Sequence, residues 1–404
     1  MDTPFLKAKP ILKKLHDNGY EAFFVGGAVR DYLLNRDIGD IDIATSAKPD
    51  EIQQIFNHTI DVGAEHGTII VLFDNLPYEV TTYRAESGYE DFRRPNSVTY
   101  ITSLEKDLKR RDFTINAMAM DSHETLYDYF NGREDLKKRV IRTVGNASER
   151  FTEDALRMLR AVRFVSQLNF ALCPTTLTAI KDYGYLLSKI SIERKTIEFD
   201  KLLKGTNYQN ALHLIVDLNI HQFLPGLIEK EQELMKLSNY DFSFLRTKEE
   251  FWTLLTYLIK PHSIEAFLRG WKLPVKLMKE VQRRIQFIDM LKDKDWDDEQ
   301  LYDAGDELAV SVERLRVVLM EWANCNERIR KIQQRFAMLP IKERGELAVT
   351  GHDVIKIVKQ NPGPWVSVAL SKIERAVVTN KVVNERNAIK EWLLTCNQDF
   401  DRNC

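Results

Sequence analysis

The hydrophobic periodicity of the chain changes near residue 135, and this change constrains the fold more than any other feature. Before it, short runs rich in Val, Ile, Thr and Tyr, such as 22–25, 68–73 and 78–83, have the composition of strands. After it, segments such as 192–203 and 208–218 repeat apolar residues every three to four positions, as amphipathic helices do. We therefore expect an α+β chain, with a helix-covered sheet followed by an elongated all-α region.

Local signals add further elements to the N-terminal part. The alternation of charge and Ile at 40–44 predicts a strand, and 45–56 predicts a helix with Ser46 as its cap. The polar segment 86–95, ESGYEDFRRP, predicts a mobile loop between two strands. In the C-terminal part, 153–168 predicts one continuous helix.

Composition excludes several classes of protein. The formal net charge of -2 excludes a uniformly basic nucleic-acid coat protein, although a local basic patch is still allowed. No run of 18 apolar residues is present, so we expect no membrane span, and the first residues lack the pattern of a secretory signal. The four cysteines are scattered, which disfavours a disulfide framework or a zinc ribbon and fits a reducing cytoplasm.

The densest chemistry lies in residues 24–45, FVGGAVRDYLLNRDIGDIDIAT. Residues i and i+2 of a strand point to the same face, so Asp40 and Asp42 are expected to project together while Ile41 and Ile43 enter the core. Two adjacent carboxylates repel each other unless a cation lies between them. Oxygen-only ligation suits Mg²⁺, so the pair is a candidate metal site.

Two glycines precede this pair, between a predicted strand and a predicted helix. Without Cβ atoms, Gly26 and Gly27 let backbone N–H groups approach a phosphate, and Arg30 lies one turn into the helix. Each signal has an ordinary structural interpretation, a tight turn for the glycines and a solvated strand face for the aspartates. Their combination within about 20 residues favours a nucleotide site.

This segment resembles the signature of the polymerase-β-type nucleotidyltransferases, in the branch that holds bacterial tRNA CCA-adding enzymes and bacterial poly(A) polymerases. KRRDFTINAMAM at 109–120 resembles the second motif of that branch, and EDALRMLRAVRF at 153–164 resembles its nucleobase-selecting helix. FLPGL at 223–227 and GELAVTGHDVIK at 345–356 resemble the bacillar type of CCA-adding enzyme, so the resemblance covers essentially the whole chain.

Positive charge is concentrated around the third motif. Between 137 and 163, three carboxylates oppose eight cationic residues, which are Lys137, Lys138, Arg139, Arg142, Arg150, Arg157, Arg160 and Arg163. On a continuous helix, Asp154, Arg157, Arg160 and Arg163 would share one face, opposite an apolar face. A solvated face accounts poorly for three arginines with a single carboxylate.

Hydrogen-bond complementarity suggests what Asp154 and Arg157 select. Asp154 only accepts and Arg157 only donates, and both cytosine and adenine offer an amino donor beside a ring acceptor. Uracil and guanine reverse this order, at a cost of about 1–3 kcal/mol for each mispaired group. The pair would therefore admit C and A. The resemblance places Arg160 and Arg163 in the nucleotide site as well, against the triphosphate or the RNA backbone.

Other residues have two open interpretations. Arg111 is a candidate for phosphate or ribose binding, while Asp112 and Asn116 either contact the sugar or form a structural pair that orients Arg111. Glu79 is a candidate third carboxylate or an exposed strand charge. A second basic cluster is either an RNA-binding surface or a salt-bridged helix face; its members are Arg314, Arg316, Arg328, Arg330, Lys331 and Arg335.

The resemblance implies template-independent addition of C, C and A to the 3′ end of tRNA from CTP and ATP, with Asp40 and Asp42 holding two Mg²⁺ ions. An A-adding enzyme, a poly(A) polymerase and a non-catalytic RNA-binding module remain alternatives, and a homodimer is left open. The resemblance also implies four segments, namely a head at 1–138, a neck at 139–205, a body at 206–300 and a tail at 301–404.

Overall fold

The computed structural model describes residues 3–63, 67–90, 94–292 and 294–396. The chain forms two compact units, residues 1–238 with 269–272 and residues 239–268 with 273–404. The boundaries of the four predicted segments stay predictions. Within the described residues, no helix combines the length and the apolar character needed to cross a membrane.

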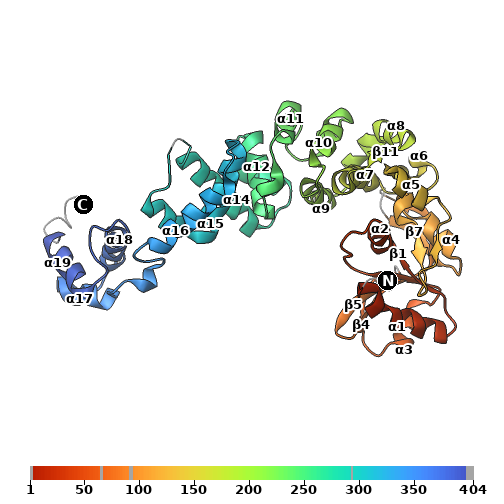
Figure 1. Cartoon of the computed structure of the whole chain (residues 1–404), viewed down its shortest axis with the longest axis horizontal. Coiled ribbons are helices and arrows are strands. Elements are labelled where there is room, and N and C mark those ends of the chain that lie inside the picture. The colour runs from red at the N-terminus through yellow and green to blue at the C-terminus, as the bar shows by residue number, and fades with distance from the viewer. Residues whose placement is uncertain (1–2, 64–66, 91–93, 293, 397–404) are drawn as a thin grey trace. The chain divides into compact units, whose positions relative to one another are not determined.

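The first unit begins with a mixed sheet and its covering helices (Figure 1). Its elements are α1 (Thr3–Asp17), β1 (Ala22–Val25), α2 (Gly27–Leu33), β2 (Asp42–Thr45), α3 (Pro49–Ile55), β3 (Thr59–Gly63), β4 (Thr68–Phe73), β5 (Leu76–Thr82), β6 (Arg84–Glu90), β7 (Arg94–Tyr100), α4 (Leu104–Lys109), the 3₁₀ helix η2 (Thr114–Asn116), β8 (Ala119–Met120) and β9 (Leu126–Tyr127).

The rest of the first unit is mainly helical, as predicted, apart from one short parallel strand pair. It consists of α5 (Gly132–Lys138), β10 (Val140–Ile141), α6 (Ala147–Glu153), α7 (Leu156–Leu168), β11 (Ala171–Leu172), α8 (Pro174–Tyr183), α9 (Ile192–Leu203), α10 (Tyr208–Asp217) and α11 (Glu231–Ser238).

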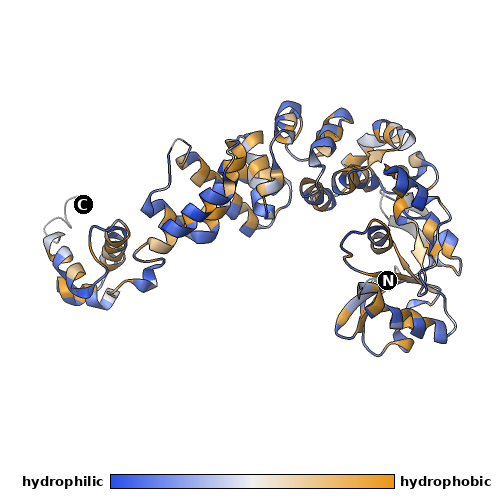
Figure 2. Ribbon diagram, in the orientation of Figure 1, coloured by the Kyte–Doolittle hydropathy of each residue, from blue (hydrophilic) through white to orange (hydrophobic). Residues whose placement is uncertain are grey.

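The remaining α-helices are α12 (Lys248–Ile259), α13 (Ile264–Gly270), α14 (Val275–Met290), α15 (Asp298–Leu319), α16 (Cys325–Met338), α17 (Gly351–Val358), α18 (Trp365–Val378) and α19 (Arg386–Cys396). Figure 2 shows that apolar and polar residues segregate to opposite sides of many of these helices, as the sequence periodicity predicts.

The large sheet has the strand order β3-β4-β5-β2-β1-β8-β9, and β2 and β5 are its parallel pair. One row of cross-strand neighbours, Phe24, Ile43, Val80 and Ile69, is fully buried. The ring of Phe5 on α1 lies 4.8 Å from that of Phe24, so α1 covers this face. The next row contains Asp42 and Glu79, which therefore project from the opposite face.

Two local predictions were wrong. The segment 86–95 is not a loop over its described part, because β6 and β7 pair in an antiparallel hairpin that includes Glu86 and Pro95; residues 91–93 and the side chains of 86–97 lie outside the described part. Ser46 does not cap α3. The helix starts at Pro49 behind Lys48, while the Ser46 hydroxyl accepts a hydrogen bond from the Glu21 N–H at 2.9 Å.

Candidate active site

The strand that carries the aspartates is shorter than predicted, but its alternation holds. β2 begins at Asp42, and Asp40 lies in the segment just before it. Ile41 is 6% exposed and Ile43 is fully buried, whereas both aspartates line a cleft of about 720 Å³. The side chains of Asp40 and Asp42 therefore face the same cavity while the isoleucines enter the core.

Glu79 lies beside Asp42 because β2 and β5 pair in register at these two residues. It lines the same cleft, so three carboxylates gather at this end. Burial raises the pKa of Asp42 to about 6, and the charges of Glu79 and Asp40 add to the rise, while Arg111 opposes it. Around Asp42 the negative charges of Glu79 and Asp40 thus outweigh the positive charge of Arg111, which favours binding of a cation.

The donor set fits a hard divalent cation shared with substrate. Within the described part of the chain, no three His, Cys, Asp or Glu side chains are arranged to hold a metal ion by themselves. Mg²⁺ commonly binds through one or two carboxylates and completes its shell with water and phosphate oxygens. Asp40 and Asp42 match that mode, because they offer only oxygen ligands and neither carboxylate forms an ion pair with a described residue.

The two glycines form the turn between β1 and α2. Gly26 has φ of 73°, a conformation that favours glycine, and α2 starts at Gly27. A Cβ atom at Gly26 would lie 3.1 Å from Arg111 Nη1 and 3.4 Å from Asp42 Oδ2. Glycine therefore lets the turn approach both the Asp42 carboxylate and the Arg111 guanidinium.

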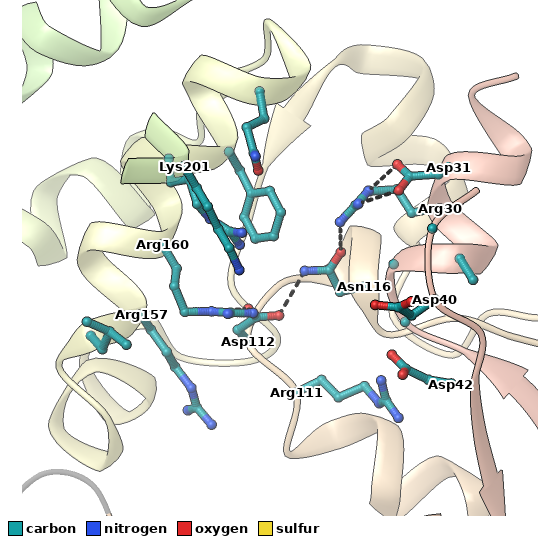
Figure 3. A pocket seen from close by; sticks show the side chains of 18 of the residues that line it. Arg30, Asp31, Asp40, Asp42, Arg111, Asp112, Asn116, Arg157, Arg160 and Lys201 are labelled. Carbon is teal, nitrogen blue, oxygen red and sulfur yellow. Dashed lines mark hydrogen bonds and ion pairs between the residues drawn. The ribbon is translucent and has the colours of Figure 1, made fainter. Parts of the chain in front are cut away.

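Arg30 reaches the cleft from α2, but its guanidinium already has partners. Its Nε and Nη2 donate to the Asp31 carboxylate at 3.0 and 2.8 Å, and its Nη1 donates to Asn116 Oδ1 at 2.6 Å (Figure 3). Asn116 donates in turn to Asp112 Oδ1 at 3.0 Å. The predicted hydrogen bond between Asp112 and Asn116 is confirmed, across the 3₁₀ turn η2 rather than on an α-helix.

Asp112 joins this chain of hydrogen bonds to α7. Arg160 Nε donates to its Oδ2 at 2.9 Å. Burial alone would raise the pKa of Asp112, but Arg160 and Asn116 hold it well below the usual range. Arg111 lies next to it in sequence and lines the cleft, with Nη2 3.5 Å from Asp107 Oδ2. Burial lowers the pKa of Arg111, and the charge of Asp107 counteracts this.

The prediction of one continuous helix over 153–168 is wrong. α6 ends at Glu153, Asp154 is extended with φ of -141° and ψ of 100°, and α7 begins at Leu156. Asp154 Oδ1 accepts a hydrogen bond at 3.1 Å from the N–H of Leu156, the first residue of α7, although the N-cap position itself is Ala155. Both Asp154 oxygens also accept from Arg194 of α9, at 3.2 and 2.7 Å.

Arg157 and Arg163 are likewise held by neighbours. Arg157 Nη1 donates to Glu153 Oε2 at 2.7 Å, and its Nη2 donates to the Arg110 carbonyl at 2.9 Å. Arg163 Nε lies 2.8 Å from Glu198 Oε2 and its guanidinium carbon lies 4.1 Å from the ring centroid of Phe164. Burial lowers the pKa of Arg163 to about 10.

The structure brings every predicted site residue into this one cleft. Its lining includes Gly27, Arg30, Asp40, Asp42, Arg111, Asp154, Arg157, Arg160 and Arg163, together with the alternatives Glu79, Asp112 and Asn116. Sequence reasoning missed Arg110, Arg194 and Lys201. Arg194 and Lys201 are seven residues apart, so helical spacing predicts that they share one face of their helix. This spacing does not show which face of the helix packs against α7.

The second basic cluster, in the second unit, is largely a salt-bridged surface. Arg316 and Arg328 both pair with the buried Glu313, at 3.0 and 2.6 Å. Arg314 pairs with Glu250 at 2.8 Å and Arg335 with Asp298 at 3.0 Å. For these four arginines the interpretation as a salt-bridged helix face is confirmed.

Three family models match successive parts of the chain. The poly A polymerase head domain matches residues 22–142, the RNA and SrmB-binding site of polymerase A matches 169–230, and the tRNA nucleotidyltransferase domain 2 matches 244–393. The first match contains the sheet with both aspartates.

Similar proteins extend over the full length. The CCA-adding enzyme of Geobacillus stearothermophilus is 49% identical over 405 residues, covering 100% of each chain. The crystal structure of Bacillus stearothermophilus CCA-adding enzyme in complex with CTP has a TM-score of 0.92 at 47% identity, again covering 100% of each chain. A tRNA nucleotidyltransferase complexed with a primer tRNA and an incoming ATP analog has a TM-score of 0.61 at 25% identity, covering 81% of this chain and 98% of that one. The chain therefore belongs to the bacterial CCA-adding enzymes, which are tRNA nucleotidyltransferases of the polymerase-β superfamily.

Proposed function

We propose that this chain adds C, C and then A to the 3′ end of tRNA, using CTP and ATP without a nucleic-acid template and releasing pyrophosphate. The observation that carries the proposal is the single cleft with Asp40 and Asp42 at one side and Arg157 at the other (Figure 3), whose lining also includes Asp154. One end suits a metal-bound triphosphate, and the other offers an acceptor and a donor to a base edge.

In this proposal Asp40 and Asp42 hold two Mg²⁺ ions, with Glu79 as the third carboxylate nearby. Bound Mg²⁺ would neutralise charge on the triphosphate and act as a Lewis acid on the attacking 3′-hydroxyl. Arg111, whose Nη1 lies close to Gly26 and to Asp42, contacts the phosphates, and the Gly26–Gly27 turn gives them room to approach the backbone. Little covalent help is needed from side chains, because positioning and electrostatic stabilisation dominate phosphoryl chemistry.

Asp154 and Arg157 select the base. Asp154 accepts from the amino group of cytosine or adenine, and Arg157 donates to the adjacent ring nitrogen. In the structure Arg194 holds Asp154 and Glu153 holds Arg157, so both groups are oriented before a base arrives. Such prior orientation limits the entropy that nucleotide binding must remove.

Product length on a gel tests the proposal. A tRNA that ends before CCA is incubated with each labelled nucleoside triphosphate, alone and mixed, in the presence of Mg²⁺. The proposal expects two C residues from CTP alone and one A after them when ATP is added. Addition of A alone, or long A tails without CTP use, would reject it. Asp40→Ala should abolish incorporation, whereas Asp37→Ala, an exposed carboxylate before β2 that does not line the cleft, should not.

A further inference from the structure

Lys201 differs from every arginine of the cleft in its partners. Each of the seven lining arginines forms an ion pair with a carboxylate: Arg30 with Asp31, Arg110 and Arg111 with Asp107, Arg157 with Glu153, Arg160 with Asp112, Arg163 with Glu198 and Arg194 with Asp154. Lys201 also lines the cleft and is exposed, and within the described residues no carboxylate pairs with it.

The unpaired negative charges of the cleft lie elsewhere. Asp40, Asp42 and Glu79 line it without forming an ion pair to any described residue. Figure 3 shows Lys201 on the side of α7 and α9, across the cleft from Asp40 and Asp42. The cleft thus has uncompensated carboxylates at one side and an uncompensated ammonium at the other. A ligand that carries both metal cations and phosphates would match that separation.

The spacing along α9 explains why Lys201 is left unpaired. Arg194, Glu198 and Lys201 are i, i+4 and i+7 neighbours and so share one helix face. The first two already have partners: Arg194 binds Asp154, two residues before α7, and Glu198 lies 2.8 Å from Arg163 on α7. Lys201, one turn further, is free to bind a ligand rather than to hold the fold together.

We propose that Lys201 is a phosphate-binding residue of this cleft, which takes a phosphate of the nucleoside triphosphate or of the tRNA acceptor strand. The inference rests on the proposed function for the presence of both substrates. A lysine ammonium binds phosphate as a compact point charge, and here no carboxylate has to be displaced first. The paired arginines offer the same ligand a weaker net attraction, because their charge is already partly neutralised.

Kinetics with three Lys201 variants and one control variant test this. Lys201→Gln and the apolar Lys201→Met remove the charge, Lys201→Arg retains it, and Lys204→Gln is the matched control, an exposed lysine just after α9 that does not line the cleft. KM values for CTP, for ATP and for tRNA are measured separately, at two salt concentrations. We expect both neutral variants to raise the KM of one substrate about 5- to 10-fold with kcat within about twofold, and the arginine variant to restore it.

The two sources of phosphate give different results. A rise in the nucleotide KM alone assigns Lys201 to the triphosphate, whereas a rise in the tRNA KM with a shallower salt dependence assigns it to the RNA backbone. Unchanged KM values for all substrates, an equal effect in Lys204→Gln, or a fall in kcat alone would overturn the proposal. Failure of the unmodified protein to add C, C and A would instead overturn the proposed function, so the two failures are distinguishable.

Discussion

Arg194 donates hydrogen bonds from both terminal nitrogens to the Asp154 carboxylate, at 3.2 and 2.7 Å. Asp154 lies in the extended segment between α6 and α7, Arg194 lies on α9, 40 positions further along the chain, and both line the cleft. Asp154 also accepts a hydrogen bond from the N–H of Leu156, the first residue of α7. The orientation of the Asp154 carboxylate, which is proposed to read the base, therefore depends on Arg194 of α9.

Replacing that partner should weaken base selection without removing catalysis. In Arg194→Gln, the Asp154 side chain loses its two-point contact and can rotate, so the ratio of kcat/KM for CTP to that for UTP should fall about 5- to 10-fold. Single-nucleotide incorporation with each triphosphate measures the ratio. Arg133→Gln, an exposed arginine on α5, is the control and should leave it unchanged. An unaltered ratio in Arg194→Gln would show that Asp154 needs no such support.

Removing Asp154 itself should have a larger effect. Asp154→Ala deletes the acceptor, so discrimination against UTP and GTP should fall by about 1–3 kcal/mol, or roughly 5- to 150-fold. The same substitution should leave the Mg²⁺ dependence unchanged, because Asp40 and Asp42 are intact. Glu149→Ala, which removes an exposed carboxylate of α6, serves as the comparison. Selectivity that survives in Asp154→Ala would reject the assignment of base reading to this residue.

Much of the fold follows from local patterns. The runs 22–25 and 68–73 form β1 and β4 with the bounds that strand composition indicates, and 192–203 forms α9 as predicted. These segments have a clear period and are flanked by turn residues, so neighbours in sequence decide them. The orientation of Asp40 and Asp42 into one cleft likewise rests on a short motif whose alternation is local.

The break at Asp154 was not predictable in this way. Residues 153–168 keep a helical pattern without Gly or Pro, and the break coincides with a contact to Arg194, far along the chain. The cleft residues of α9 were missed for the same reason: helical spacing shows that Arg194 and Lys201 share a face but not which helix that face meets. The β6–β7 hairpin was taken for a loop because its residues are polar and charged.

The pKa of Asp42 makes a prediction about pH. Its folded value of about 6 lies above its ordinary value of 3.8, so the shift stabilises the folded state below pH 3.8, and this stabilisation is lost as pH rises through about 6. A bound cation needs the ionised form. The apparent Mg²⁺ requirement should therefore rise about tenfold for each pH unit below that pKa, measured as activity against Mg²⁺ concentration across pH.

In Glu79→Gln, the pH below which the Mg²⁺ requirement begins to rise should be lower, because Glu79 contributes to the rise in the pKa of Asp42. Glu105→Gln, at an exposed position of α4, provides the control. If that pH is the same in Glu79→Gln as in the unmodified protein, the charge of Glu79 does not act on Asp42.

Glu313 should be essential for the stability of the second unit. Its side chain is 1% exposed, pairs with Arg316 and Arg328, and accepts from Trp296 Nε1 at 3.0 Å. Glu313→Ala would leave the buried Arg316 without its carboxylate, at a cost of about 3–5 kcal/mol in the free energy of unfolding. Urea denaturation measures this cost, and the exposed Glu327→Ala should change stability by less than about 0.5 kcal/mol. Equal midpoints for the two variants would contradict a structural role.

A crystal structure of this chain with CTP and Mg²⁺ tests the central claim most directly. The account predicts the amino group of cytosine within hydrogen-bond distance of Asp154, the ring nitrogen facing Arg157, and metal density between the triphosphate and the carboxylates of Asp40 and Asp42. Nucleotide bound outside this cleft, or a cytosine edge that contacts neither residue 154 nor residue 157, would contradict it.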